Sequence, residues 1–124
     1  MYAKTVKVYC DEKEAFLEDM ETNEKIYDKH YFPIAYWEFV INENASVLIL
    51  KHKQKTFNNP IYKIINPSEY FMLAQMDNDG NFVGSSSIEI NRLKGTAILR
   101  FYEDKFIDIY YLHNCSREKP VKLF

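Results

Sequence analysis

The chain has 124 residues, of which 47% are apolar and 27% charged, with three Gly, four Pro and a net charge of −2. At this size roughly 65% of the unfolded chain's surface can be buried on folding, which is enough for a cooperative core. These values exclude a disulfide-dense toxin, a collagenous or low-complexity chain and a multidomain enzyme. They predict a single domain over residues 1–124.

Aromatic residues make up 16% of the chain, with ten Tyr, nine Phe and one Trp. Six residue types with AT-rich codons (Phe, Tyr, Met, Ile, Asn and Lys) supply 58 residues, against 16 for Gly, Ala, Arg and Pro. This bias is typical of an AT-rich genome, such as that of a low-GC bacterium or phage. It enriches Tyr and Phe without any selection for binding, so the aromatic content alone indicates no function.

Charge is distributed unevenly along the chain. Residues 10–43 hold ten acids and three lysines, a local net charge of −7, so the other 90 residues carry +5. Such a division can steer a charged partner if the two segments fold apart.

The N-terminal segment lacks the apolar core of a signal peptide, and no apolar run approaches the roughly 18 residues that a membrane span needs. We therefore expect a cytoplasmic protein that does not bind membranes. Cys10 and Cys115 are far apart in the chain, and in a reducing compartment two free thiols are expected rather than a disulfide. No metal or other cofactor is expected, because no second pair with ligand spacing accompanies His113 and Cys115.

Residues 12–22 are predicted to form a helix. Asp11 has the position of an N-cap, Glu14 completes a capping box, and the segment contains neither Gly nor Pro. Such a helix should lie on the surface, because its apolar stripe is thin. The stripe consists of Phe16, Leu17 and Met20.

After a loop the pattern changes to alternation of polar and apolar residues, which predicts strands joined by hairpins. The first hairpin places Phe39 opposite Leu48 on an aromatic and aliphatic face. The second turns at residues 78–80 and places Met72 opposite Ser86. Each register follows from the expected length of the turn.

The last hairpin joins residues 96–102 and 106–113. A three-residue loop opposes Arg100 to Asp108, and we prefer this register because a two-residue loop would place Arg100 among isoleucines. With residues 3–9 and 61–65 also counted, the sequence predicts about eight strands. The expected fold class is α+β, mostly antiparallel β: a small barrel or sandwich with one N-terminal surface helix.

No nucleophile elbow, zinc-binding helix, phosphate-binding loop or dinucleotide fingerprint is present in the sequence. We therefore expect a non-catalytic binding protein, such as an inhibitor, an immunity-type protein or an accessory protein. Its partner would be another macromolecule, most simply a protein, bound through an acidic and aromatic surface. The residues expected on that surface are Asp11, Glu14, Glu18, Asp19, Glu21, Tyr27 and Tyr31.

Three alternatives remain open. A basic patch with neighbouring aromatics could bind nucleic acid, and its residues are Lys51, Lys53, Lys55 and Lys63. A barrel could hold a small ligand, because the small side chains of residues 84–87 leave room inside it. The expected pocket residues are Trp37, Tyr70, Met72, Ser86 and Tyr110. A small hydrolase or nuclease is the third alternative, with no catalytic residue assigned.

Overall fold

The computed structural model describes residues 5–27, 36–51, 60–78 and 81–118. These ranges hold nine β-strands and no helix. In chain order the strands are β1 (Thr5–Asp19), β2 (Lys25–Ile26), β3 (Trp37–Asn42), β4 (Val47–Lys51), β5 (Ile61–Pro67), β6 (Phe71–Asn78), β7 (Asn81–Asn91), β8 (Thr96–Tyr102) and β9 (Phe106–Ser116).

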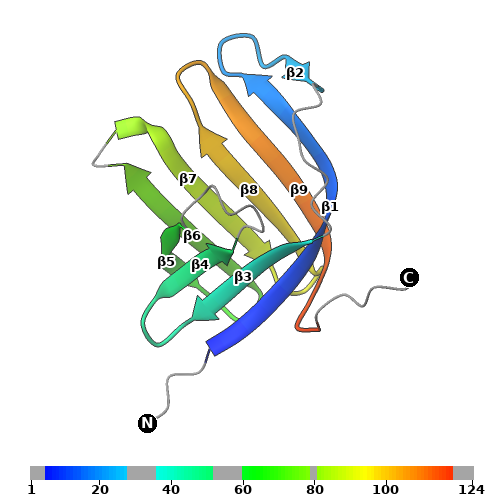
Figure 1. Cartoon of the computed structure of the whole chain (residues 1–124), viewed down its shortest axis with the longest axis vertical. Coiled ribbons are helices and arrows are strands. Elements are labelled where there is room, and N and C mark those ends of the chain that lie inside the picture. Colours follow the sequence, from blue (N-terminus) through cyan, green and yellow to red (C-terminus); the bar gives the residue numbers. More distant parts are fainter. Residues whose placement is uncertain (1–4, 28–35, 52–59, 79–80, 119–124) are drawn as a thin grey trace.

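Eight of the strands form a closed antiparallel barrel (Figure 1). Neighbours follow the order β1-β3-β4-β5-β6-β7-β8-β9, and β9 pairs with β1 to close the sheet. The short strand β2 lies outside the ring, where Ile26 pairs with Leu17 of β1. The expected α+β class is therefore wrong: the described part of the protein is all-β, and its architecture is a barrel rather than a sandwich.

The segment predicted as a helix forms the second half of β1 and the turn that follows it. Pairing between β1 and β9 extends from Tyr9 to Asp19 and leaves Phe16 only 1% exposed. This long pairing provides backbone hydrogen bonds and buries apolar surface, which outweighs the weak local preference for a helix. The side chain that accepts hydrogen bonds from backbone N–H groups in this segment is Asp19, not the predicted N-cap Asp11. Its Oδ1 accepts from Glu21 and Thr22 in the turn after β1.

Two irregularities in β1 decide which of its side chains face the core. The register against β9 shifts between Tyr9 and Asp11, and again between Glu12 and Glu14. Since directly paired residues share a face, Glu12 points inward with its partner Leu112, while Glu14 points outward. The acidic residues of this segment therefore do not all lie on one side of the sheet.

Apolar side chains from all eight barrel strands fill the interior. The first two hairpins keep the predicted inward faces but change register. Phe39 pairs with Leu50 rather than Leu48, and Met72 pairs with Ile90 rather than Ser86. The second change arises because β7 has extra residues near its turn, where the register shifts. Gly84, with φ of 87°, lies in this irregular stretch.

The last hairpin takes the register that the sequence argument rejected. The N–H of Glu103 donates to the carbonyl of Phe106, so the loop has two residues, and Arg100 pairs with Ile109. Arg100 is stable there because Glu89 of β7 lies 3.1 Å from its Nη1. Glu89 lies on a third strand, outside the hairpin formed by β8 and β9. The slip of one residue turns Asp108 into the barrel.

A disulfide joins Cys10 of β1 to Cys115 of β9, with the two Cα atoms 4.1 Å apart. The expectation of two free thiols is therefore wrong. The strands are distant in the sequence but neighbours in the closed sheet, which brings the two sulfur atoms together. The bond reinforces the seam at which the barrel closes.

Candidate functional site

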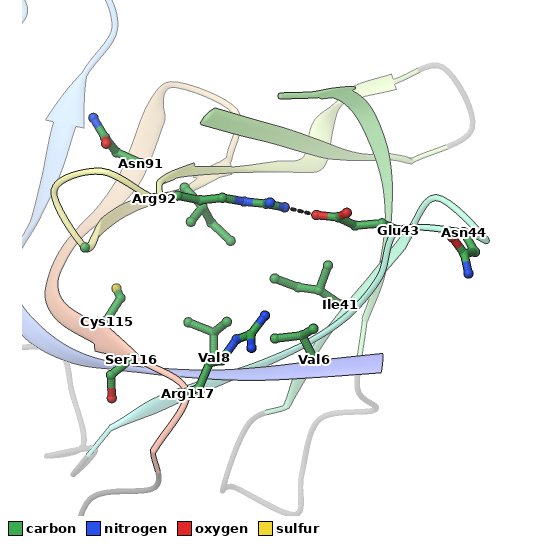
Figure 2. Close-up of a pocket in the computed structure, with 12 residues that line it drawn as sticks. Val6, Val8, Ile41, Glu43, Asn44, Asn91, Arg92, Cys115, Ser116 and Arg117 are labelled. Carbon is green, nitrogen blue, oxygen red and sulfur yellow. Dashed lines mark hydrogen bonds and ion pairs between the residues drawn. The ribbon is translucent and has the colours of Figure 1, made fainter. Parts of the chain in front are cut away.

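A pocket of about 440 Å³ opens at one end of the barrel (Figure 2). We call this end the pocket end; it contains the start of β1, the end of β9 and the turns at residues 43–46 and 92–95. The floor of the pocket is apolar and comes from three different strands. Its side chains are Val6, Val8, Ile41 and Ile90.

The rim of the pocket is polar and carries an ion pair across the opening. The guanidinium group of Arg92, on the β7–β8 turn, donates to the carboxylate of Glu43, on the β3–β4 turn (Figure 2). These two turns are half the ring apart in the order of the strands. The pair therefore spans the mouth of the barrel from one side to the other.

The two turns that carry this ion pair are built alike. Each turn follows an Asn whose side-chain Oδ1 accepts a hydrogen bond from the backbone N–H of the residue three positions later. Ala45 donates to Asn42 at 3.1 Å, and Lys94 donates to Asn91 at 3.0 Å. Each also ends in a residue with positive φ, which is Ser46 in one turn and Gly95 in the other. Glu43 and Arg92 are the first residues of their turns, so equivalent local structures direct opposite charges toward each other.

Gly95 ties the rim to the end of β9. Its φ is 66°, and its carbonyl accepts a hydrogen bond of 2.9 Å from the N–H of Cys115. A Cβ on Gly95 would lie 3.4 Å from the Cys115 carbonyl oxygen. The rim is thereby attached to the strand that the disulfide fastens to β1.

Arg117 supplies the second guanidinium group of the pocket. It follows directly on β9, is exposed, and lines the pocket together with Ser116. Figure 2 shows its side chain turned into the pocket between Val6 and Val8. Within the described ranges no ion pair is formed by Arg117. In the part of the chain that the structure describes, one carboxylate and two guanidinium groups therefore line this opening.

The opposite half of the barrel interior contains two carboxyl groups among aromatic rings. The hydroxyl of Tyr110 donates to Asp108 Oδ2 at 3.2 Å, and the rings of Trp37 and Tyr110 lie 5.1 Å apart. Burial raises the pKa of Glu12, an effect that a hydrogen bond with the Trp37 side chain opposes and the charge of Asp108 reinforces. Burial, together with Asp108, also raises the pKa of Tyr110.

A buried hydroxyl chain crosses the interior between β5 and β8. The hydroxyls of Tyr62 and Ser86 are 2.7 Å apart, and Ser86 Oγ donates to the carbonyl of Arg100 at 2.7 Å. Because Ser86 gives its proton to that carbonyl, Tyr62 donates to Ser86. Burial raises the pKa of Tyr62 to about 12.

The structure brings together most of the residues predicted for an internal pocket, but not around the open space. Trp37, Met72, Ser86 and Tyr110 all face the interior, where Met72 is fully buried and Ser86 is 2% exposed. Tyr70 lies on the turn between β5 and β6 and is 57% exposed. None of the five lines the pocket at the barrel end.

The predicted acidic and aromatic surface is partly assembled on the outer wall. Phe16 packs between Tyr27 and Tyr111, with ring centroids 5.5 and 5.7 Å away, and Lys25 lies over its ring. A hydrogen bond with Glu14 raises the pKa of the exposed Tyr27. Glu18 follows on the same outward face of β1, and Asp11 Oδ2 accepts a hydrogen bond from Asn114 at 3.4 Å. Asp19 is the last residue of β1, and Glu21 lies in the turn that follows it. Tyr31 lies outside the described residues.

The predicted basic patch is not assembled by the residues that can be placed. Lys51 lies 3.8 Å from Glu38 at one end of β4, whereas Lys63 pairs with Val47 at the other end. Four strand positions separate them, about 13 Å. Lys53 and Lys55 lie outside the described residues.

Sequence reasoning missed Glu43, Arg92 and Arg117. The local signal was present as two Asn-led turns with opposite charges in the same position, in Asn42 to Ser46 and in Asn91 to Gly95. What the sequence does not show is that the turns face each other, because this depends on closure of the sheet between β1 and β9.

In the described ranges no helix could span a lipid bilayer. No group of three or more His, Cys, Asp or Glu side chains among those residues is placed to hold a metal ion. Comparison with protein-family models, curated proteins and solved structures gave no match to this chain. The proposals below therefore rest on the chain's own geometry.

Proposed function

We propose that the protein binds a small molecule in the pocket at the open end of its barrel. The pocket of about 440 Å³ supports this proposal, because ligand sites have volumes of roughly 300–1,000 Å³ and commonly occupy the mouths of barrels. An apolar floor with few polar groups on the rim is also the usual composition of such sites.

Two features indicate a preformed ligand site rather than a loosely packed end of the barrel. The floor residues Ile41 and Ile90 are each 4% exposed, so they are held by the core and do not need a ligand to order them. The turn at residues 92–95 is held by the hydrogen bond between Cys115 and Gly95. A preformed site loses less entropy when it binds.

The proposal is tested with N-phenyl-1-naphthylamine, an uncharged probe whose fluorescence increases in apolar surroundings. We expect saturable binding to the wild type and at least about tenfold weaker binding to Val6→Phe, whose ring would occupy the floor; tenfold corresponds to about 1.4 kcal/mol. Lys7→Phe is the matched control, because it places the same ring on the outward side of the same strand. Circular dichroism checks that both variants fold.

Absence of saturable probe binding to the wild type would refute the proposal. So would equal weakening by Val6→Phe and Lys7→Phe, because the probe would then be reporting general surface hydrophobicity rather than the pocket.

Binding of another macromolecule through the outer wall is the second candidate. The observation that favours it is the cluster of Phe16, Tyr27 and Tyr111 beside Glu14, with Tyr27 60% exposed. Aromatic residues ringed by charge are common at protein interfaces. This candidate predicts a protein partner retained at low salt that is lost with Tyr27→Ala and kept with Val6→Phe; the reverse pattern would count against it.

A further inference from the structure

The charges around the pocket point to the chemical class of its ligand. Of the described residues, the lining includes Arg92, Arg117 and one carboxylate, Glu43, which together give a net positive charge of one. The Arg92 side chain is about one-third exposed and that of Glu43 about one-half, which leaves their ion pair open to competition from water or a ligand.

Arg92 already has a carboxylate bound to it. Its partner Glu43 reaches it from the opposite side of the barrel mouth (Figure 2). The guanidinium group of Arg92 therefore binds an anionic group at the rim of the opening. A guanidinium fork binds carboxylates with two parallel hydrogen bonds. A carboxylate on a ligand could therefore take the place of Glu43.

Arg117 lies beside the apolar floor rather than above it. Its guanidinium group is directed between Val6 and Val8, where a ligand's hydrocarbon body would rest (Figure 2). The lining thus presents an apolar floor and two cationic groups within one opening. A neutral apolar ligand would satisfy only the floor, and a small inorganic anion would satisfy only the rim.

We infer that the pocket binds an amphipathic monocarboxylate, with its hydrocarbon body on Val6, Val8, Ile41 and Ile90 and its carboxylate on Arg117 and Arg92. This inference rests on the proposed function and specifies its ligand class. Glu43 then acts as the competitor that occupies Arg92 when the ligand is absent, and the ion pair across the mouth opens as the ligand enters.

The inference is tested by displacing N-phenyl-1-naphthylamine with decanoate or with 1-decanol, which share a ten-carbon chain and differ in charge. Decanoate should displace the probe at a concentration at least about tenfold lower than decanol, a preference of about 1.4 kcal/mol. Arg117→Gln should reduce this preference, because decanoate loses a cationic partner that decanol does not use. Lys94→Gln removes one positive charge from an exposed position on the β7–β8 turn that does not line the pocket, and should keep the preference.

Glu43→Gln provides an independent arm of the test. Removal of the competing carboxylate should tighten decanoate binding relative to decanol binding, by about threefold or more. Weaker decanoate binding by this variant would overturn the competitor role.

The outcomes separate the two proposals. If the probe binds but decanoate and decanol displace it equally, or neither displaces it, the carboxylate inference fails and the small-molecule proposal stands. If decanoate is preferred equally by the wild type and Arg117→Gln, the assigned site is wrong. If the wild type does not bind the probe, the proposed function itself fails.

Discussion

Glu12 and Asp108 place two carboxyl groups inside a barrel whose interior is otherwise mostly apolar. Asp108 accepts a hydrogen bond from the hydroxyl of Tyr110. Removing a charge from water is unfavourable, so burial raises the pKa of Glu12 and favours its neutral form. Burial of Glu12 therefore makes the stability of the protein depend on pH.

Replacement of Glu12 by Gln should stabilise the protein near neutral pH and have less effect in acid. The pKa of Glu12 is raised above its ordinary value of 4.5, chiefly by burial. Its contribution is therefore fully present below pH 4.5 and is lost as the pH rises through the raised folded-state pKa, where the carboxylate becomes charged. Gln has nearly the same shape as Glu and carries no charge at any pH in this range.

Urea unfolding between about pH 4 and pH 8 measures this difference. The gap between Glu12→Gln and the wild type should widen as the pH rises. Glu21→Gln, in the exposed turn after β1, is the control and should stay within about 0.5 kcal/mol of the wild type. A gap for Glu12→Gln that narrows toward neutral pH would contradict the assigned burial of the charge.

The turns at the pocket end show how short elements position the site. Residues 43–46 and 92–95 use the same device, a preceding Asn that accepts a backbone hydrogen bond and a final residue with positive φ. Glycine adopts that backbone conformation without the steric cost that other L-residues meet. Gly95 also lies close to the backbone of Cys115. Both its backbone conformation and its lack of a side chain therefore favour glycine at this position of the turn.

Gly95→Ala should destabilise the protein by about 1–2 kcal/mol, because a methyl group disfavours a left-handed backbone. It should also weaken probe binding, since Gly95 lines the pocket. Urea unfolding and probe titration measure the two effects. Gly95→Asn is the matched variant, because Asn tolerates positive φ better than Ala, and it should lose less stability. Equal stability of the wild type and Gly95→Ala would show that the turn relaxes without cost.

Periodicity predicted the strands after residue 36 well, because alternating faces are a local property of the chain. Phe39 and Leu48 lie in the core on the face predicted for the first hairpin, and Met72, predicted to line an internal pocket, is buried there as well. The registers were less accurate, because they depend on irregularities such as the extra residues in β7 and on partners in a third strand such as Glu89 for Arg100. The helix prediction for residues 12–22 failed for the same reason: the pairing of that segment with β9 is a contact across most of the chain.

The closed sheet determines what the whole molecule can offer a ligand. Closure between β1 and β9 places the two charged turns opposite each other and gathers Val6, Ile41 and Ile90 at one end. The candidate site could not be predicted from the sequence, because no local pattern reports closure. Cytoplasmic location stays a prediction. The expectation of two free thiols, which was based on that location, is contradicted by the disulfide.

Reduction of the Cys10–Cys115 disulfide should lower the free energy of unfolding by about 2–5 kcal/mol, because the bond restricts the unfolded chain over a long loop. Urea unfolding with and without reductant measures the loss. The double variant Cys10→Ser/Cys115→Ser should match the reduced wild type and be insensitive to reductant. An unchanged unfolding midpoint in the reduced wild type would show that strand pairing alone holds the seam.

The same bond changes the topology of the polymer, because it makes a covalent ring from residue 10 to residue 115 that contains seven complete strands. A single peptide-bond cleavage anywhere inside the ring opens it without releasing a fragment. The cleaved protein should keep its mass under non-reducing conditions and separate into two pieces only after reduction. The barrel can therefore survive a cut in one of its loops as a single covalent molecule.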